Sequence, residues 1–151
     1  MEKKASEIQK ERIKEIEDKA SALLQKCDVV YLASINENDY PRICSITKVK
    51  AENFTDIWFF TSKRSELNGK ATHFEKNPKA SVCYQMDGNS VTLIGNIEII
   101  SNMDEKRKFD HLCDRAFFKK GVEDPKCYLL KFHTIEATFW IDGKFRTCKY
   151  K

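Results

Sequence analysis

The chain has 151 residues, a length typical of a single globular domain that can bury a core of its own. Its 41% hydrophobic and 33% charged residues exclude a disordered or fibrous protein. The net charge of +4, from 27 Lys and Arg against 23 Asp and Glu, is too small and too well mixed to predict nucleic-acid binding. We therefore expect one globular domain over residues 1–151.

The N-terminal residues contain no apolar segment of the length found in signal peptides or membrane spans, so we expect a cytoplasmic protein without membrane contact. Apolar residues at helical spacing predict instead an amphipathic helix within residues 1–26, packed on the rest of the domain. Six cysteines occur singly and without a CxxC pair, which favours free thiols over disulfides or a zinc site. No metal site is predicted.

Further along the chain, β-branched and aromatic residues predict a strand at Cys27–Ile35, and alternation predicts a second at Arg42–Lys50. A third strand, Ile57–Thr61, is followed by a hydroxyl-rich basic stretch and a short helix, Lys70–Lys76. Pro78 explains why that helix ends, because the residue before a proline is disfavoured in helical conformation.

Two strands, Ala80–Met86 and Ser90–Ile100, are predicted around a hairpin turn at residues 87–89. Gly95 within the second strand indicates a bulge or a close backbone approach. Apolar residues from Met103 to Phe117 then predict a second amphipathic helix.

The C-terminal part contains three more strand-like segments, Tyr128–His133, Ile135–Asp142 and Phe145–Cys148. Strands that follow one another through tight turns pair antiparallel, and such a sheet hides its edges by closing into a barrel or a sandwich. We therefore expect a mainly β protein with helices at intervals.

The segment from Asp56 to Pro78 is the strongest candidate for a binding site. Its apolar run leads directly into hydroxyls, cations and an amide: Thr61, Ser62, Lys63, Arg64, Ser65, Asn68 and Lys70. Such donors suit a phosphate group, although an ordinary surface loop has the same composition. The three histidines lack the spacing of a metal or catalytic motif.

The chain resembles the pyridoxamine 5′-phosphate oxidase-like flavoproteins, and within them the small general stress protein branch. The resemblance spans residues 23–148 and is carried by four blocks in the family's order: DYPRICSIT, IWFFTSKRSELNGKATHFEKNPKASVCY, SVTLIGNIEII and IEATFWIDGKF. It implies an α+β, mainly β fold, a six-stranded antiparallel split β-barrel with flanking helices. It also implies a homodimer that binds FMN at the subunit interface.

The same resemblance implies a set of FMN contacts: Arg42, Ile43, Cys44, Ser45, Phe60, Thr61, Ser62, Arg64, Ser65, Lys70, Gln85 and Trp140. Residues 42–46 would follow the flavin ring, and residues 60–70 would hold the ribityl chain and the phosphate. Gln85 and Trp140 would approach the ring, and the second subunit could be the one that contributes them. Many relatives have Arg-Pro-Met in the second strand where this chain has Cys44, Ser45 and Ile46, so Arg42, Lys63 or Arg64 must supply the missing charge.

Two functions are consistent with these features. The first is a small FMN-dependent oxidoreductase that uses a small-molecule electron donor and acceptor. The second is a non-catalytic protein that binds or senses FMN or a related cofactor; a deazaflavin fits better than haem, because the histidines are scattered. Pyridoxamine-phosphate oxidase activity itself is not expected, since the Arg/His-rich C-terminal motif of that enzyme is missing.

Overall fold

The computed structural model describes residues 2–62 and 69–151. Within these residues the chain forms the following helices and strands in order: α1 Glu2–Lys26, β1 Val29–Ile35, β2 Pro41–Asn53, β3 Asp56–Ser62, α2 Lys70–Lys76, β4 Lys79–Met86, β5 Asn89–Ile100, α3 Met103–Arg107, β6 Cys127–Ile141 and β7 Lys144–Lys149. Two short 3₁₀ turns, Asp110–Leu112 and Gly121–Glu123, lie between α3 and β6.

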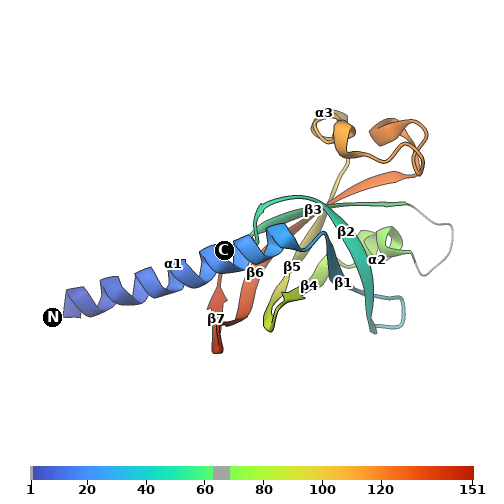
Figure 1. Cartoon of the computed structure of the whole chain (residues 1–151). Helices are drawn as coiled ribbons and strands as arrows, with labels where there is room; N and C mark the ends of the chain where they lie inside the picture. Colours follow the sequence, from blue (N-terminus) through green and yellow to red (C-terminus); the bar gives the residue numbers. More distant parts are fainter. Residues whose placement is uncertain (1, 63–68) are drawn as a thin grey trace.

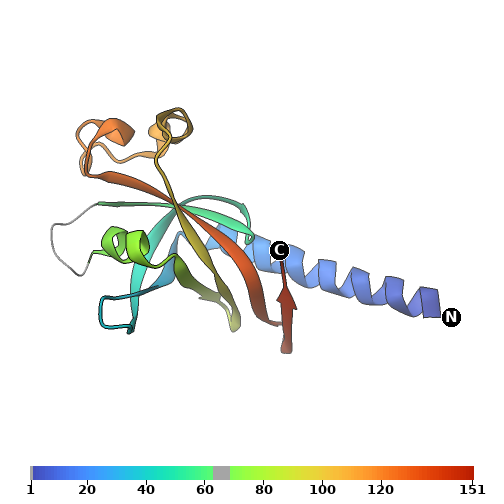
Figure 2. The same cartoon turned by 180° about the vertical axis from the view of Figure 1, so that it is seen from behind.

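The strands form one antiparallel sheet in the order β3-β2-β1-β4-β5-β6-β7. An additional pairing of β3 with β6 closes the first six of these strands into a barrel, and β7 extends the sheet beyond the closure point. The expected mainly β fold with a six-stranded antiparallel barrel is therefore confirmed (Figures 1 and 2).

Alternating side chains explain why the barrel has a single core. Along β5, residues 91, 93, 95 and 97 are buried while their neighbours at 92, 94, 96 and 98 are exposed. The largest fully buried side chains include Phe59, Phe132 and Phe139 from the strands that meet at the closure. Strand periodicity thus directs apolar side chains to the interior and leaves a mixed outer face.

Helix α1 is anchored in the core by its C-terminal half. Ala20 and Leu24 are fully buried against the barrel, and the Tyr84 hydroxyl donates to the Ala20 carbonyl oxygen over 2.8 Å. The N-terminal half projects away from the barrel (Figure 1). No helix among the described residues is long and apolar enough to cross a membrane.

The prediction of two strands at residues 128–133 and 135–142 is wrong, because the structure has one continuous strand there, β6. The register against β5 shifts at Gly95, which pairs with Thr134 while Ile94 pairs with Glu136. A Cβ on Gly95 would lie 2.0 Å from the His133 carbonyl oxygen. The predicted bulge and close approach at Gly95 are both confirmed, and they bend β6 without ending it.

The predicted helix from Met103 to Phe117 is also wrong beyond Arg107. Residues 103–126 fold back on themselves as a lobe over one end of the barrel, which we call the cap (Figures 1 and 2). Phe109 packs on Trp58, with ring centroids 5.7 Å apart, and Phe118 packs on Phe60. These contacts with the barrel outweigh the helical periodicity of the segment.

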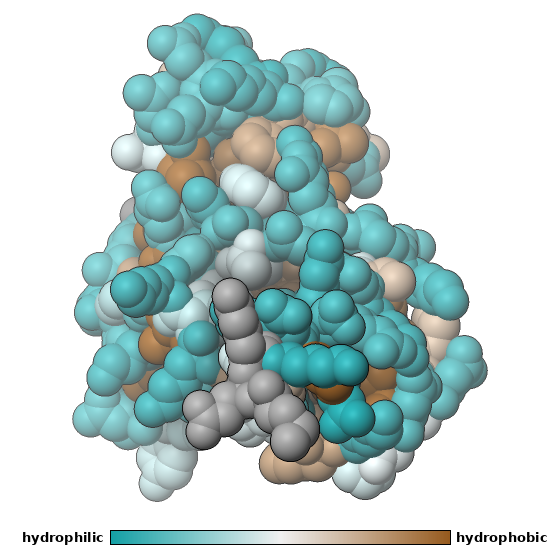
Figure 3. All heavy atoms as spheres, turned by 90° about the vertical axis from the view of Figure 1, so that its left-hand side faces the viewer, coloured by the Kyte–Doolittle hydropathy of each residue, from teal (hydrophilic) through white to brown (hydrophobic). Residues whose placement is uncertain are grey.

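The surface seen along α1 is mostly hydrophilic (Figure 3). Apolar residues gather just beneath the hydrophilic lobe at the top of this view. A hydrophilic outer surface with apolar contacts below it is the expected arrangement for a small lobe that packs on a barrel.

Candidate functional site

A pocket lined mainly by polar side chains lies where β1, β2 and β3 meet the start of α2. Its lining, which we call the polar pocket, consists of Ser34, Arg42, Cys44, Thr61, Ser62, Gly69 and Lys70. The set offers three hydroxyl groups, one thiol and two cationic side chains. No carboxylate belongs to the described lining, so the electrostatics favour an anion.

Strand register explains how distant residues reach this pocket. Ser34 of β1 pairs directly with Arg42 of β2, and Leu32 pairs with Cys44. Thr61 and Ser62 end β3, whose other edge pairs with β6. Lys70 is the first residue of α2, and with Gly69 before it brings the start of that helix to the pocket.

A wider hollow adjoins the polar pocket and shares Thr61, Ser62 and Lys70 with it. Its volume is ≈ 620 Å³, within the range of pockets that hold cofactors and small ligands. The wide hollow is lined by β2, β3 and the cap: Ser45, Ile46, Thr47, Lys48, Val49, Phe60, Thr61, Ser62, Lys70, Leu112, Asp114, Phe117 and Phe118. A polar end joined to a partly aromatic cavity suits an elongated ligand with an anionic tail and a planar head.

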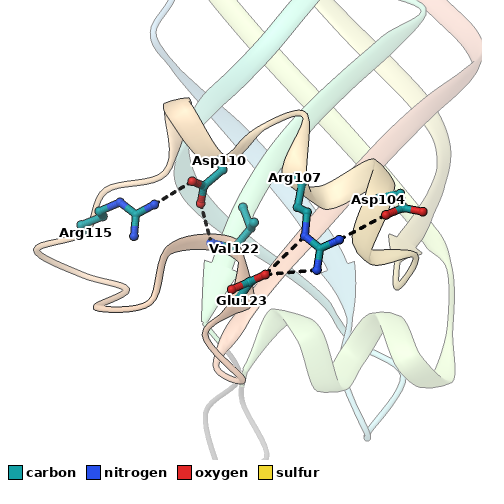
Figure 4. A network of polar contacts seen from close by, with 6 residues as sticks. All are labelled: Asp104, Arg107, Asp110, Arg115, Val122 and Glu123. Atoms are coloured by element: carbon teal, nitrogen blue, oxygen red, sulfur yellow. Dashed lines mark hydrogen bonds and ion pairs between the residues drawn. The ribbon is translucent and has the colours of Figure 1, made fainter.

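A network of ion pairs and hydrogen bonds holds the cap in shape (Figure 4). Arg107 contacts Asp104 at 3.2 Å and Glu123 at 3.2 Å. The Asp110 carboxylate accepts from the Arg115 guanidinium over 2.6 Å and from the Val122 backbone N–H over 3.1 Å. These links join the two ends of the cap, which places its aromatic side chains over the hollow.

The aromatic side of the cap is only partly covered. Phe118 is buried and stacks edge-on against Phe117, whose ring centroid lies 5.1 Å away. Phe117 is nevertheless 66% exposed, and Leu112 is 42% exposed. Two large apolar side chains thus border the wide hollow with much of their surface in contact with solvent. A planar ligand in the hollow would cover that surface.

The cysteines near the site are free thiols, as predicted for all six. Cys44 in the polar pocket donates weakly to the Leu32 carbonyl oxygen over 3.5 Å. At the base of the cap, burial raises the pKa of Cys127 to about 12, and burial also raises the pKa of Cys113. Both thiols are therefore protonated at neutral pH and poor nucleophiles.

The structure brings most of the predicted FMN contacts together. Five of them line the polar pocket: Arg42, Cys44, Thr61, Ser62 and Lys70. Ser45 and Phe60 line the wide hollow. Ile43 lines neither hollow; it is 68% exposed and, by strand alternation, lies on the same face of β2 as Ser45.

Two predicted contacts lie elsewhere, and two are not described. Gln85 and Trp140 pair with Ser90 from opposite edges of β5, so β5 lies between them, near the far end of the sheet from the polar pocket. Arg64 and Ser65, together with Lys63 and Asn68, lie outside the described residues. Predictions for these four stay untested.

Sequence reasoning missed Ser34 and the lining residues of the cap. Ser34 is 2% exposed within a strand that is otherwise apolar apart from Tyr31, and a buried hydroxyl in such a strand is a signal for a polar partner. The cap residues carried no usable signal, because their apolar spacing predicted a helix. Among the described residues, no group of three or more His, Cys, Asp or Glu side chains is placed to hold a metal ion.

Comparison with known proteins supports the interpretation of this fold. A family model described as pyridoxamine 5′-phosphate oxidase like matches residues 15–149. A comparison with curated proteins found no match.

Solved structures show the same fold at low sequence identity. A protein from Clostridium acetobutylicum related to general stress protein 26 is 22% identical, with a TM-score of 0.71 over 85% of this chain and 89% of that one. A haem-binding protein from Mycobacterium smegmatis is 14% identical, with a TM-score of 0.67 over 89% of this chain and 57% of that one. A pyridoxamine 5′-phosphate oxidase-related FMN-binding protein from Nostoc punctiforme is 14% identical, with a TM-score of 0.60 over 82% of this chain and 88% of that one.

The family match covers all six strands of the barrel, including those that line both hollows. With the closed barrel and the polar pocket, it establishes that this chain belongs to the pyridoxamine 5′-phosphate oxidase-like family.

Proposed function

We propose that this chain is an FMN-binding flavoprotein and acts as a small flavin-dependent oxidoreductase. The main supporting observation is that two hollows adjoin and share lining residues. One is lined by hydroxyls and cations, and the other by strand β2 and aromatic cap residues. A bound flavin supplies hydride or electron transfer, and the protein supplies position and electrostatics.

The polar pocket fits the phosphate. A phosphate dianion loses its hydration on binding and needs several donors and at least one cation in return. Thr61 and Ser62 supply hydroxyls, while Lys70 and Arg42 supply charge. Arg42 lines the pocket, while Lys63 and Arg64, the other two cations considered for the missing strand-two arginine, lie outside the described residues. The proposal gives that role to Arg42.

The wide hollow fits the ring system and the ribityl chain. Ser45 and the backbone of β2 form one wall, and Phe60 and the cap aromatics form the other. Haem is less well supported, since no histidine belongs to the described lining of either hollow. Imidazole is the commonest axial ligand that such a pocket would need.

A homodimer with the cofactor at its interface belongs to the same proposal. The barrel and β7 expose large apolar side chains on β1, β5, β6 and β7: Val29, Tyr31, Ile94, Trp140 and Phe145. Exposed apolar side chains of this size are common in protein–protein interfaces. Gln85 and Trp140, which lie far along the sheet from the hollows, would contact a flavin only if a second copy brought them to it.

A non-catalytic flavin binder or sensor is the second candidate, and one observation favours it. The described lining of the wide hollow contains a single carboxylate, Asp114, and no histidine, so side chains suited to proton transfer are few. The electron donor and acceptor of an enzyme would be small molecules that reach the open side of the hollow.

Reconstitution tests the proposal directly. The purified chain is incubated with FMN, desalted, and its visible absorbance is recorded; retention of stoichiometric flavin is the expected result. Addition of NADH or NADPH under anaerobic conditions, followed by an electron acceptor, separates enzyme from binder by the rate of bleaching and recovery. Loss of all flavin on desalting, with no quenching of flavin fluorescence on titration, would refute flavin binding.

A further inference from the structure

We propose that the buried side chain of His73 is a positioning residue of the phosphate site, and that His73 takes up a proton when a phosphate monoester binds. This inference rests on the proposed function and deepens it. It assigns a role to a residue that lines neither hollow and that the flavin site as described above does not use.

The geometry connects His73 to the polar pocket through one side chain. The His73 ring is 3% exposed, and its Nδ1 lies 2.8 Å from the Oγ of Ser34. Ser34 is itself buried and lines the polar pocket. The hydroxyl of Ser34 therefore stands between the imidazole and any anion in the pocket.

The other ring nitrogen is the unusual feature. His73 Nε2 is buried and has no hydrogen-bond partner, whereas buried polar atoms are nearly always paired. Its nearest charged neighbour is the Glu37 carboxylate, with Oε2 at 3.7 Å. Glu37 lies in the turn after β1 and lines, with His73, a second small pocket on that side of α2.

The two neutral forms of the ring each leave one contact unfavourable. If the proton sits on Nε2, then Nδ1 accepts from Ser34, and the hydroxyl presents only lone pairs to an anion. If the proton sits on Nδ1, Ser34 is free to donate to the anion, but the Nε2 lone pair faces the Glu37 carboxylate.

The doubly protonated ring removes both conflicts. Nδ1–H then donates to Ser34, the Ser34 hydroxyl donates to the anion, and Nε2–H faces Glu37. The imidazolium also adds positive charge behind a pocket whose strand-two position holds Cys44 where many relatives have arginine. A bound dianion thus favours the protonated form of His73, and by linkage that form binds the dianion more tightly.

The other charges around His73 do not replace this effect. Asp39 and Lys76 line the same small pocket on the Glu37 side, with opposite signs, and Lys70 and Arg42 lie on the phosphate side. Helix α2 packs against β1, β3 and β5, whose ionisable residues are Tyr31, Asp56 and Glu98. Tyr31 is exposed on the outer face, Asp56 pairs with His133, and Glu98 is exposed opposite Lys131.

The test compares FMN with riboflavin, which has the same ring and ribityl chain but no phosphate. Calorimetric titrations at pH 7.5, in two buffers that differ in ionisation enthalpy, give the number of protons taken up on binding. At this pH the phosphate is already mostly dianionic, because its second pKa is about 6. We expect proton uptake with FMN and none with riboflavin. With rising pH the FMN affinity should fall, by up to about tenfold per unit, wherever the complex keeps the His73 proton that the free chain has lost, and the riboflavin affinity should not follow it.

Three variants assign the proton to His73. His73→Asn keeps an amide N–H near the Nδ1 position and cannot titrate, so it should bind FMN with no proton uptake. His73→Leu should weaken FMN binding by about tenfold or more and leave riboflavin binding within about twofold. Glu37→Gln, at a partly exposed turn where the fold tolerates change, should reduce the proton uptake; Glu52→Gln removes an exposed carboxylate elsewhere and should not.

The outcomes distinguish the two levels of the proposal. If the wild-type chain binds neither flavin, the proposed function fails and this inference fails with it. If it binds FMN with the same proton uptake as riboflavin, only the role of His73 is refuted. That role is also refuted if His73→Leu weakens the binding of both flavins equally, because a merely structural residue would have this effect. The wild-type titrations with the two flavins test the proton uptake even if a variant does not fold.

Discussion

Combined replacement of Lys70 and Thr61 by alanine tests the phosphate assignment most sharply. Both residues line the polar pocket and the wide hollow, at the junction where the phosphate and the ribityl chain of FMN would meet. Both are half-buried, and Thr61 lies near the end of β3, so that truncation removes little of the core. We expect the double variant to fold and to lose FMN.

The magnitude follows from the chemistry of the contacts. A hydrogen bond to a charged group contributes about 1.5–3 kcal/mol, which is about 10- to 150-fold in the dissociation constant. Two such contacts to one phosphate give about a hundredfold to ten-thousandfold, less any coupling between them. Riboflavin lacks the phosphate, and its affinity should change by less than about fivefold.

Fluorescence quenching of each flavin by wild-type and variant chains measures these constants. Lys76→Ala is the matched control, since it removes the same charge from the same short helix but at an exposed position outside both hollows. Thermal unfolding verifies the fold of every variant. The assignment is wrong if the double variant keeps wild-type FMN affinity, or if it loses riboflavin as severely as FMN.

Three further predictions concern the barrel and its surface. Gly95→Ala should destabilise the fold by about 3 kcal/mol or more, because the added methyl group would collide with the His133 carbonyl oxygen; an unchanged melting temperature would contradict the bulge. The pKa of His133 is raised, chiefly by its hydrogen bond with Asp56, so this contact stabilises the fold fully below the ordinary histidine value of 6.5 and is lost as pH rises through the higher folded-state pKa. The loss should appear as a small fall in melting temperature above pH 6.5 that is absent in Asp56→Asn. Trp140→Glu should convert a dimer into a monomer in light scattering, whereas a wild-type chain that is monomeric at every concentration would remove the proposed shared site.

The local elements follow from the sequence because they depend on neighbouring residues. The sequence predicts the short helix at Lys70–Lys76 with the bounds observed, since Pro78 and the residues before it determine where it ends. The hairpin at residues 87–89 is likewise predicted, and Asp87 and Gly88 both adopt the positive φ that such a turn needs. The pattern fails for the cap, where contacts of Phe109 and Phe118 with the barrel override a helical spacing.

In the polar pocket, too, a run of residues that are close in sequence is predicted and a distant one is missed. Thr61, Ser62 and Lys70 are predicted as phosphate ligands because they follow one another along the chain. Ser34 is not, since only the pairing of β1 with β2 places it beside Arg42. In the sequence His73 is an ordinary histidine on a short helix, and its contact with Ser34 spans 39 residues of sequence.

The sequence by itself therefore determined most of the strands, the turns, the fold family and the polar segment after β3, because periodicity, turn chemistry and motif order are properties of adjacent residues. The tertiary structure alone decided which of these residues meet. Closure of β3 on β6, the fold of the cap and the Ser34–His73–Glu37 arrangement all depend on the packing of segments far apart in the chain. A single sequence does not encode such contacts in any local pattern, so the complete form of the site became visible only in the folded barrel.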